Sequence, residues 1–301
     1  MNLPDSLKNV AFVASVVAAA GCTTEGDEHS PGAADTSVQV VKFQLVRNAT
    51  MKLTYGETTF LIDPMLAEKG AYKGFSGTPR SELRNPLVEL PIPIDEILKA
   101  DAIILTHLHE DHWDEAAKRI VPRSMPIFTQ NEDDAEAVRA DGFSNVSVLT
   151  GTGANFKGTQ LIKTVAQHGS AQMYTIPQVS KVLGQVMGIV FQHEGYKTAY
   201  VVGDSIWTPK VEEVLTKYKP GVVFLNTGYA QIDGFKGSII MGKEDLYRAY
   251  NFAPQAKIVG IHMEAVNHAL LTRRELKEYI VEKGMDSTRA LVPLDGQRYN
   301  F

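Results

Sequence analysis

Cysteine is nearly absent from this sequence: among 301 residues, Cys22 is the only one. A single thiol cannot form a disulfide within the chain, so cysteine pairing gives no information about the cellular compartment. A hydrophobic content of 44% is nevertheless sufficient for a large core. We therefore expect one large domain preceded by a short tail.

A surplus of positive charge is also lacking. The chain carries 30 Lys and Arg against 35 Asp and Glu, its net charge is −5, and the basic residues are dispersed. A surface that binds nucleic acid needs a basic stripe to neutralise phosphates. These numbers exclude nucleic acid as an expected partner and leave a small molecule as the expected one.

The apolar run at residues 10–21 is too short to span a bilayer, but it has the length of a signal-peptide core. The residues Ala19-Ala20-Gly21-Cys22 that end it resemble a bacterial lipoprotein processing site, although Ala19 stands where Leu is commoner. We predict a signal peptide over residues 1–21 and a lipid anchor at Cys22. The alternative is an N-terminal extension with an incidental cysteine.

Residues 22–37 predict a flexible tether, because they are rich in Thr, Gly, Asp, Glu, Ser, Pro and Ala and contain no aromatic residue. Residues 38–301 then form the folded domain. This organisation predicts an exported protein, anchored to a membrane and facing the periplasm or the cell exterior, with a cytoplasmic protein as the alternative.

The most informative stretch lies at residues 101–114, where a short apolar run meets a cluster of potential ligands. Ala102–Leu105 is rich in β-branched residues and predicts a buried strand. The loop after it carries His107, His109, Asp111 and His112. Three imidazoles and a carboxylate at one strand end indicate a metal site. The alternative is a polar loop whose histidines only donate and accept hydrogen bonds.

The motif His-x-His-x-Asp-His in residues 107–112 resembles that of the metallo-β-lactamase superfamily. The resemblance implies an α/β fold, a four-layered αββα sandwich, and a centre of two metal ions. It also implies three further ligands at later strand ends: His168, Asp204 as the carboxylate that bridges both metals, and His262. Taken singly, His168 could be a core histidine and Asp204 a turn residue after Gly203.

The rest of the chain alternates between strand and helix patterns. Periodicity and turn residues predict strands at 38–46, 51–55, 58–62, 102–105, 126–129, 146–149, 159–167, 186–192, 198–202, 221–225, 256–261 and 290–293. They predict helices at 93–99, 113–120, 132–140, 209–217, 244–252 and 273–283. Residues 65–92 and 169–185 lack a pattern, and we expect both to be loops that border the site.

Mixed imidazole and carboxylate ligands suit Zn²⁺, with Mn²⁺ or Fe²⁺ as alternatives, and no cysteine ligand is present to force zinc. Two divalent cations about 3.5–4 Å apart can share a water and convert it to hydroxide near neutral pH. In the family that the motif resembles, Asp111 would also orient this nucleophile. Asp63, before Pro64, is either a group that orients a metal ligand or a turn residue.

Three polar residues follow His262 closely: Glu264, Asn267 and His268. We expect them to deliver protons or contact the substrate, and we name Glu264 and His268 as catalytic candidates. For His268 the alternative is a structural or surface histidine.

The order of these motifs most resembles the branch of the superfamily that includes L-ascorbate-6-phosphate lactonase. It implies a metal-dependent hydrolase that cleaves a lactone, ester or phosphodiester bond, in a family whose members form oligomers. A di-iron redox protein of the same fold is one alternative, although it would usually have an acidic residue in place of His109. A non-catalytic metal-binding surface protein is the other.

Overall fold

The computed structural model describes residues 39–301. The predicted signal peptide (1–21) and tether (22–37) lie outside these residues. Within the described part, no helix is both long enough and apolar enough to cross a membrane.

Two seven-stranded mixed sheets form the centre of the domain. The first sheet has the strand order β14-β1-β2-β3-β4-β5-β6. Its strands are β14 (Arg298–Asn300), β1 (Lys42–Arg47), β2 (Thr50–Tyr55), β3 (Thr58–Ile62), β4 (Ala102–Ile104), β5 (Ile127–Thr129) and β6 (Val146–Val148). Pairing is antiparallel from β14 to β3 and parallel from β3 to β6.

The second sheet has the order β13-β12-β11-β10-β9-β8-β7. Its strands are β13 (Ala290–Leu291), β12 (Lys257–Ile261), β11 (Val222–Asn226), β10 (Ala199–Val201), β9 (Met187–Gln192), β8 (Thr159–Val165) and β7 (Ala154–Phe156). Pairing is parallel from β13 to β10 and antiparallel from β10 to β7.

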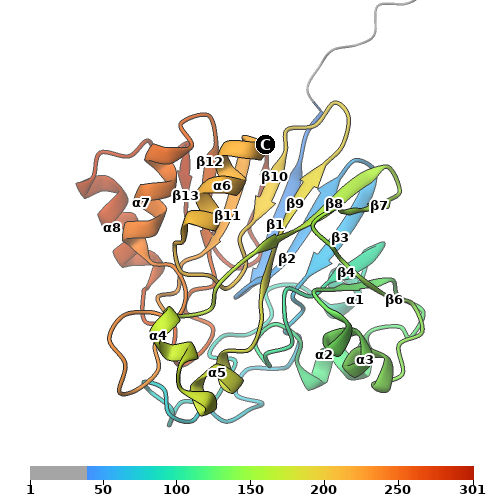
Figure 1. Cartoon of the computed structure of the whole chain (residues 1–301), viewed down its shortest axis with the longest axis horizontal. Helices are drawn as coiled ribbons and strands as arrows, with labels where there is room; N and C mark the ends of the chain where they lie inside the picture. The colour runs from blue at the N-terminus through green and yellow to red at the C-terminus, as the bar shows by residue number, and fades with distance from the viewer. Residues whose placement is uncertain (1–38) are drawn as a thin grey trace, which may run out of the picture. The chain divides into compact units, whose positions relative to one another are not determined.

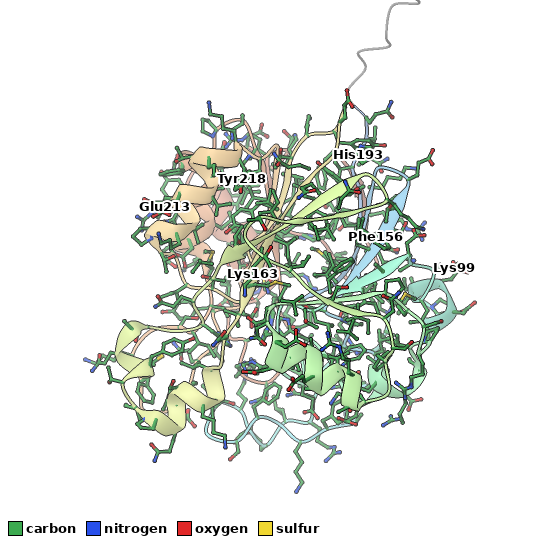
Figure 2. All side chains as sticks on the ribbon, turned by 45° about the vertical axis from the view of Figure 1, so that its right-hand side comes forward. Lys99, Phe156, Lys163, His193, Glu213 and Tyr218 are labelled. Atoms are coloured by element: carbon green, nitrogen blue, oxygen red, sulfur yellow. The ribbon has the colours of Figure 1, made fainter. Side chains whose placement is uncertain are left out.

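Helices cover the outer face of each sheet, as Figure 1 shows. The first sheet packs against α1 (Ile94–Ile97), α2 (Glu115–Ile120) and α3 (Glu132–Ala140), and the second against α6 (Pro209–Tyr218), α7 (Lys243–Phe252) and α8 (Arg273–Glu282). In Figure 2, Glu213 on α6 and Lys99 just after α1 lie at opposite margins of the molecule. The predicted α/β fold with four αββα layers is confirmed.

The inner faces of the two sheets share one apolar core. Phe43 of β1 contacts Phe224 of β11, with ring centroids 4.7 Å apart, and Phe60 of β3 contacts Phe191 of β9 at 5.4 Å. Phe156, labelled in Figure 2, extends this layer from β7 towards Phe60. Apolar residues alternate along β2, where Met51, Leu53 and Tyr55 face the other sheet.

The structure differs from the sequence predictions mainly in short elements. The segment 169–185 was expected to be a loop, but it contains α4 (Ala171–Tyr174) and α5 (Pro177–Leu183). Helices of one or two turns have too few residues to show a periodic pattern. Strands β7 and β14 were missed for the same reason, since each has only three residues. Residues 65–92 contain no helix or strand, as predicted.

Strand direction explains why distant residues meet. Strands β3 and β4 run parallel, so their C-terminal ends lie at the same edge of the first sheet. Strands β8 and β10 are both antiparallel to β9 and therefore run in the same direction, together with β11 and β12. Residues that follow these strands are consequently delivered to one end of the sandwich.

Candidate metal centre

The structure brings the seven predicted ligands together at that end. Four follow β4 within eight residues of its last residue, and one each follows β8, β10 and β12. Six are buried, and His109 is partly exposed. Their nitrogen and oxygen atoms form three overlapping groups, each with ligand atoms within 4.8 Å of one another.

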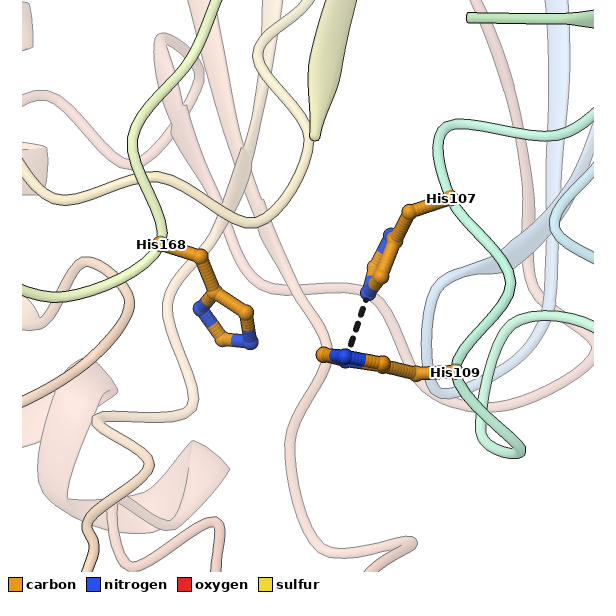
Figure 3. Close-up of side chains that lie close together, drawn as sticks. All are labelled: His107, His109 and His168. Atoms are coloured by element: carbon orange, nitrogen blue, oxygen red, sulfur yellow. Dashed lines mark hydrogen bonds between the residues drawn. The ribbon is translucent and has the colours of Figure 1, made fainter. Parts of the chain in front are cut away.

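The first group consists of His107, His109 and His168, which Figure 3 shows facing one another from two different segments. Nε2 of His107 lies 2.9 Å from Nδ1 of His109. The outer nitrogens of two of the rings are 2.8–2.9 Å from backbone carbonyls: Nε2 of His109 from Val182 O, and Nδ1 of His168 from Ile239 O. Because a carbonyl can only accept, these outer nitrogens carry the hydrogen, and in the neutral rings the inner nitrogens present lone pairs.

The second group consists of Asp111, His112 and His262. Nε2 of His262 lies 3.2 Å from Oδ2 of Asp111 and 3.2 Å from Nε2 of His112. Nδ1 of His112 donates to Oδ2 of Asp63 at 2.8 Å, so its Nε2 is the inward-facing nitrogen. In both groups, the nitrogen and oxygen atoms that could bind a metal ion therefore face a common centre.

Asp204 lies between the two groups. Its Oδ2 is 3.2 Å from Nε2 of His112 and 3.8 Å from Nε2 of His168, and its Oδ1 is 3.7 Å from Nε2 of His262. The carboxylate thus faces imidazoles from both groups. This is the position that a bridging ligand requires.

Electrostatics divide the buried imidazoles into two kinds. Against the effect of burial, Asp204 and neighbouring carboxylates raise the pKa of His112 and His262, and carboxylates that favour a proton there would equally favour a metal cation. Burial lowers the pKa of His107 well below its ordinary value, with the neighbouring His112 adding to the shift, and burial lowers the pKa of His168 to about 4. Both rings are then neutral near pH 7, the form that binds a metal ion. Burial alone would raise the pKa of Asp204, but His112 and His262 hold it well below its ordinary value. The donor set of five imidazoles and two carboxylates fits divalent cations such as Zn²⁺.

Asp63 orients two parts of the β4 loop. Besides accepting from His112, it accepts from the backbone N–H and the hydroxyl of Thr106, both at 2.7 Å, and the Thr106 hydroxyl lies 3.0 Å from Nδ1 of His107. It also has a left-handed φ of 47° before Pro64. Asp63 is therefore a turn residue, and it also holds the ring of a candidate ligand, His112, in place.

Two asparagines were missed by the sequence analysis. Asn226, the last residue of β11, donates to Oδ1 of Asp204 at 2.6 Å. The side-chain amide of Asn48 donates to the backbone carbonyl of Asp111 at 3.1 Å. The backbone carbonyl of Asn48 accepts from the backbone N–H of His262. Asn226 follows a buried strand at the same sheet edge as Asp204, a signal that could have identified it.

A cavity of about 200 Å³ opens beside the candidate ligands. His109, Asp111 and His168 reach it, together with His268. The ring of His268 is 8% exposed, its Nδ1 has no hydrogen-bond partner within the described residues, and it packs edge-on against Phe75 with ring centroids 4.9 Å apart. Since Nδ1 is itself shielded from solvent, His268 borders the cavity through the rest of its ring.

Glu264 does not occupy the position predicted for it. Its carboxylate accepts from the backbone N–H and the guanidinium of Arg273, at 2.8 and 2.6 Å, and Arg273 also pairs with Asp295. Glu264 is outside the set of described residues that line the cavity. Glu264 belongs instead to an ion-pair cluster at the start of α8, and a catalytic role for it stays a prediction.

Comparison with known proteins identifies the family. Residues 58–263 match the model of the beta-lactamase superfamily domain. UPF0173 protein YddR of Bacillus subtilis is 47% identical over 85% of this chain and 98% of its own length. A UPF0173 metal-dependent hydrolase of Korarchaeum cryptofilum is 25% identical over 77% of this chain and 88% of its own.

Two solved structures are similar along their whole length. An isothiocyanate hydrolase from Delia radicum gut bacteria is 48% identical, with a TM-score of 0.84, over 86% of this chain and 99% of its own. A possible metal-dependent hydrolase from Veillonella parvula is 41% identical, with a TM-score of 0.85, over 87% of this chain and 99% of its own. This chain therefore belongs to the UPF0173 family of metal-dependent hydrolases, within the metallo-β-lactamase superfamily.

Proposed function

We propose that this chain hydrolyses small, uncharged isothiocyanates at a two-metal centre. The observation that carries the proposal is the character of the cavity. Apolar side chains form much of its lining, namely Phe75, Val182, Leu183, Ile232 and Ile239, and no Lys or Arg is among the described residues that line it. A volume of about 200 Å³ lies below the usual range for drug-sized ligands, which favours a small substrate.

The 48% identical isothiocyanate hydrolase supports this substrate class. An isothiocyanate, R–N=C=S, carries an electrophilic carbon and an uncharged substituent R that suits apolar walls. A phosphorylated substrate, such as that of the lactonase branch suggested by motif order, would need cationic partners away from the metals. The cavity lining supplies none, so we favour an uncharged substrate over a phosphodiester or a phosphorylated lactone.

The residues divide into two candidate metal sites. His107, His109 and His168 would hold one divalent cation, and Asp111, His112 and His262 the other, with Asp204 shared between them. Two such cations lower the pKa of a shared water and so supply hydroxide near neutral pH. We expect Zn²⁺, with Mn²⁺ or Fe²⁺ as alternatives.

Two protein side chains complete the reaction. Asp111 lines the cavity and lies beside His262, where its carboxylate would orient the attacking oxygen. His268 lines another side of the cavity, and burial lowers its pKa to about 4, so the ring is neutral near pH 7. We assign it to pass a proton from the attacking water to the substrate nitrogen. In the overall reaction, R–N=C=S and H₂O give R–NH₂ and COS. A C–O bond forms, the C–N bond breaks, and the nitrogen receives both protons of the water.

Metal analysis and a substrate panel test this proposal. The purified protein should contain metal and release amine from phenethyl isothiocyanate faster than it cleaves an uncharged lactone, an ester or a phosphodiester. Removal of metal with a chelator should abolish turnover, and adding Zn²⁺ should restore it. Preferred cleavage of a lactone or ester would replace the isothiocyanate assignment, and turnover that survives complete metal removal would contradict the two-metal proposal.

A pair of histidine variants separates the role of His268 from general effects of losing a ring. His268→Gln should reduce amine release about 10²-fold or more, the size of a general acid–base contribution, while bound metal stays unchanged. His193→Gln is the matched control, because His193 is half-buried in the turn between β9 and β10 and is outside the set of described residues that line the cavity. Equal activity of the two variants would remove His268 from the reaction.

A further inference from the structure

Asn267 is the most densely bonded side chain near the cavity, and the proposed reaction does not use it. It is fully buried, with 0% exposure. Its Oδ1 accepts from the N–H of Phe75 and from Nδ2 of Asn85, both at 2.9 Å. Its Nδ2 donates to the hydroxyl of Thr78 at 2.9 Å and to the carbonyl of Pro79 at 2.8 Å. One carboxamide thus makes four hydrogen bonds to the segment 75–85.

The backbone of Asn267 contacts the same segment. Its N–H donates to Oδ1 of Asn85 at 2.9 Å, and its carbonyl accepts from Nε of Arg80 at 2.7 Å. The guanidinium of Arg80 also donates to the carbonyl of Ala269. The residues on both sides of His268 are therefore tied to the segment 75–85.

These contacts fix one wall of the cavity. Phe75 and Thr78 both line the cavity and both are bonded to Asn267. The ring of Phe75 lies edge-on to His268, with an interplanar angle of 83°. Asn267 therefore bonds to the backbone of Phe75 and to the hydroxyl of Thr78, although Asn267 is outside the set of described residues that line the cavity.

We propose that Asn267 is a positioning residue that sets the separation between Phe75 and His268, and thereby the width of the substrate cavity. The chemistry of the side chain requires a carboxamide. A carboxylate has the same shape but no donor, so it would face the carbonyl of Pro79 with lone pairs only. The hydroxyl of Thr78 could donate to it only by giving up its present acceptor, the carbonyl of Phe75. The consequence for substrate binding rests on the proposed function, whereas the position of Phe75 does not.

Asn267→Asp is the direct test, measured first without substrate. In the Zn²⁺-loaded protein at one fixed pH, the ring current of Phe75 should displace the ¹H NMR signals of His268, which are identified by their loss in His268→Gln. Asn267→Asp and Phe75→Leu should both remove this displacement and leave bound metal unchanged. Unchanged His268 signals in Asn267→Asp would overturn the proposal.

The second measurement uses phenethyl isothiocyanate. Asn267→Asp should raise KM about tenfold and change kcat less, because a displaced wall weakens binding in the ground state and the transition state alike. A kcat loss with unchanged KM would contradict the assignment to the cavity wall. If the wild type turns over no isothiocyanate, the proposed function fails while the NMR result still decides the role of Asn267.

A control variant distinguishes positioning from general loss of stability. Leu276→Ala removes a fully buried side chain of α8 from the core behind the second sheet. It should lower the melting temperature at least as much as Asn267→Asp, yet keep the His268 signals and KM of the wild type. If Leu276→Ala moves them equally, Asn267 has only a structural role.

Discussion

The two walls of the cavity are built in contrasting ways. The wall at residues 65–92 contains no helix or strand, whereas a second wall is formed by Val182 and Leu183 of the helical pair α4–α5. From regular structure alone, the helical wall would be expected to be the better fixed of the two. The contacts indicate the reverse.

Buried polar groups hold the wall at 65–92 in place. The guanidinium of Arg47 donates to the carbonyls of Met65, Ala67 and Val88, and the carboxylate of Asp114 accepts from two N–H groups of the same wall. Asn267 makes four side-chain hydrogen bonds to residues 75–85 of the same wall. Since hydrogen bonds are directional, this wall has a defined position without periodic structure.

The α4–α5 wall depends more on apolar packing. Met173 and Leu183 pack with Ile239 in a small cluster of their own, and Val182 next to them is 65% exposed. One of the few polar links of this wall runs from His109 to the carbonyl of Val182. Apolar contacts have no preferred direction, so they define the position of this wall less strictly than hydrogen bonds would. The positions of the cavity walls are therefore defined by buried polar contacts rather than by helices.

The largest expected effect comes from His109→Ala, which should abolish turnover and reduce the amount of bound metal. It should also free the α4–α5 wall, because the carbonyl of Val182 loses its donor. Trypsin cleavage after Lys181 should therefore become faster, while cleavage within 65–92 stays unchanged. Activity assays, metal analysis and timed proteolysis measure the three effects. Wild-type activity with wild-type metal content would show that His109 is not a ligand.

The next largest effect is expected from Asp114→Ala, which removes hydrogen bonds to the wall at residues 65–92. It leaves the N–H groups of Leu66 and Ala67 without their acceptor and removes the N-cap of α2. We expect a loss of about 3 kcal/mol or more in the free energy of unfolding, since each buried group left unpaired costs roughly 1–3 kcal/mol and a lost cap about 1 kcal/mol. Urea denaturation measures the change.

Asp114→Asn is the matched variant, because it keeps one acceptor oxygen and the shape of the side chain. It should lose less stability than Asp114→Ala. In both variants proteolysis within 65–92 should increase and cleavage after Lys181 should not. Equal loosening of both walls would contradict the view that they are held independently.

The smallest effect is expected from Val182→Ser on the exposed side of the α4–α5 wall. Stability should change by no more than about 0.5 kcal/mol, as for most surface substitutions. KM for phenethyl isothiocyanate should rise a few-fold, with a smaller rise for a short alkyl isothiocyanate that does not reach this wall. An equal rise for both substrates would show that Val182 does not contact the substituent.

Much of the fold and of the site could be predicted because the signals are local. A β-branched run before His107 identifies a strand, and strand ends then place His168, Asp204 and His262 in one neighbourhood. The helix at 132–140 was predicted with the boundaries that the structure shows. In each case the residues whose pattern predicts the strand, helix or ligand are the same residues that form it.

What could not be predicted depends on partners far away in the sequence. Strand β14 exists because its three residues pair with β1, more than 250 residues earlier. Asn48 and Asn267 carry no charge and form no motif, so only their partners show what they do. The backbone has a left-handed φ of 63° at both His262 and Glu264. Although Glu264 lies only two residues after a candidate ligand, this turn of the chain directs it away from the centre.

The spread of the candidate ligands along the chain has a consequence for folding. They extend from His107 to His262 and reach the centre from both sheets. No short fragment contains them all, so the native state would bind a metal ion more tightly than the unfolded chain, in which only the four candidate ligands of residues 107–112 lie close together. Metal concentration would then shift the folding equilibrium by mass action, by about 2.7 kcal/mol at a hundred times the dissociation constant. The full set of candidate ligands would therefore form late in folding, after the two sheets have packed together.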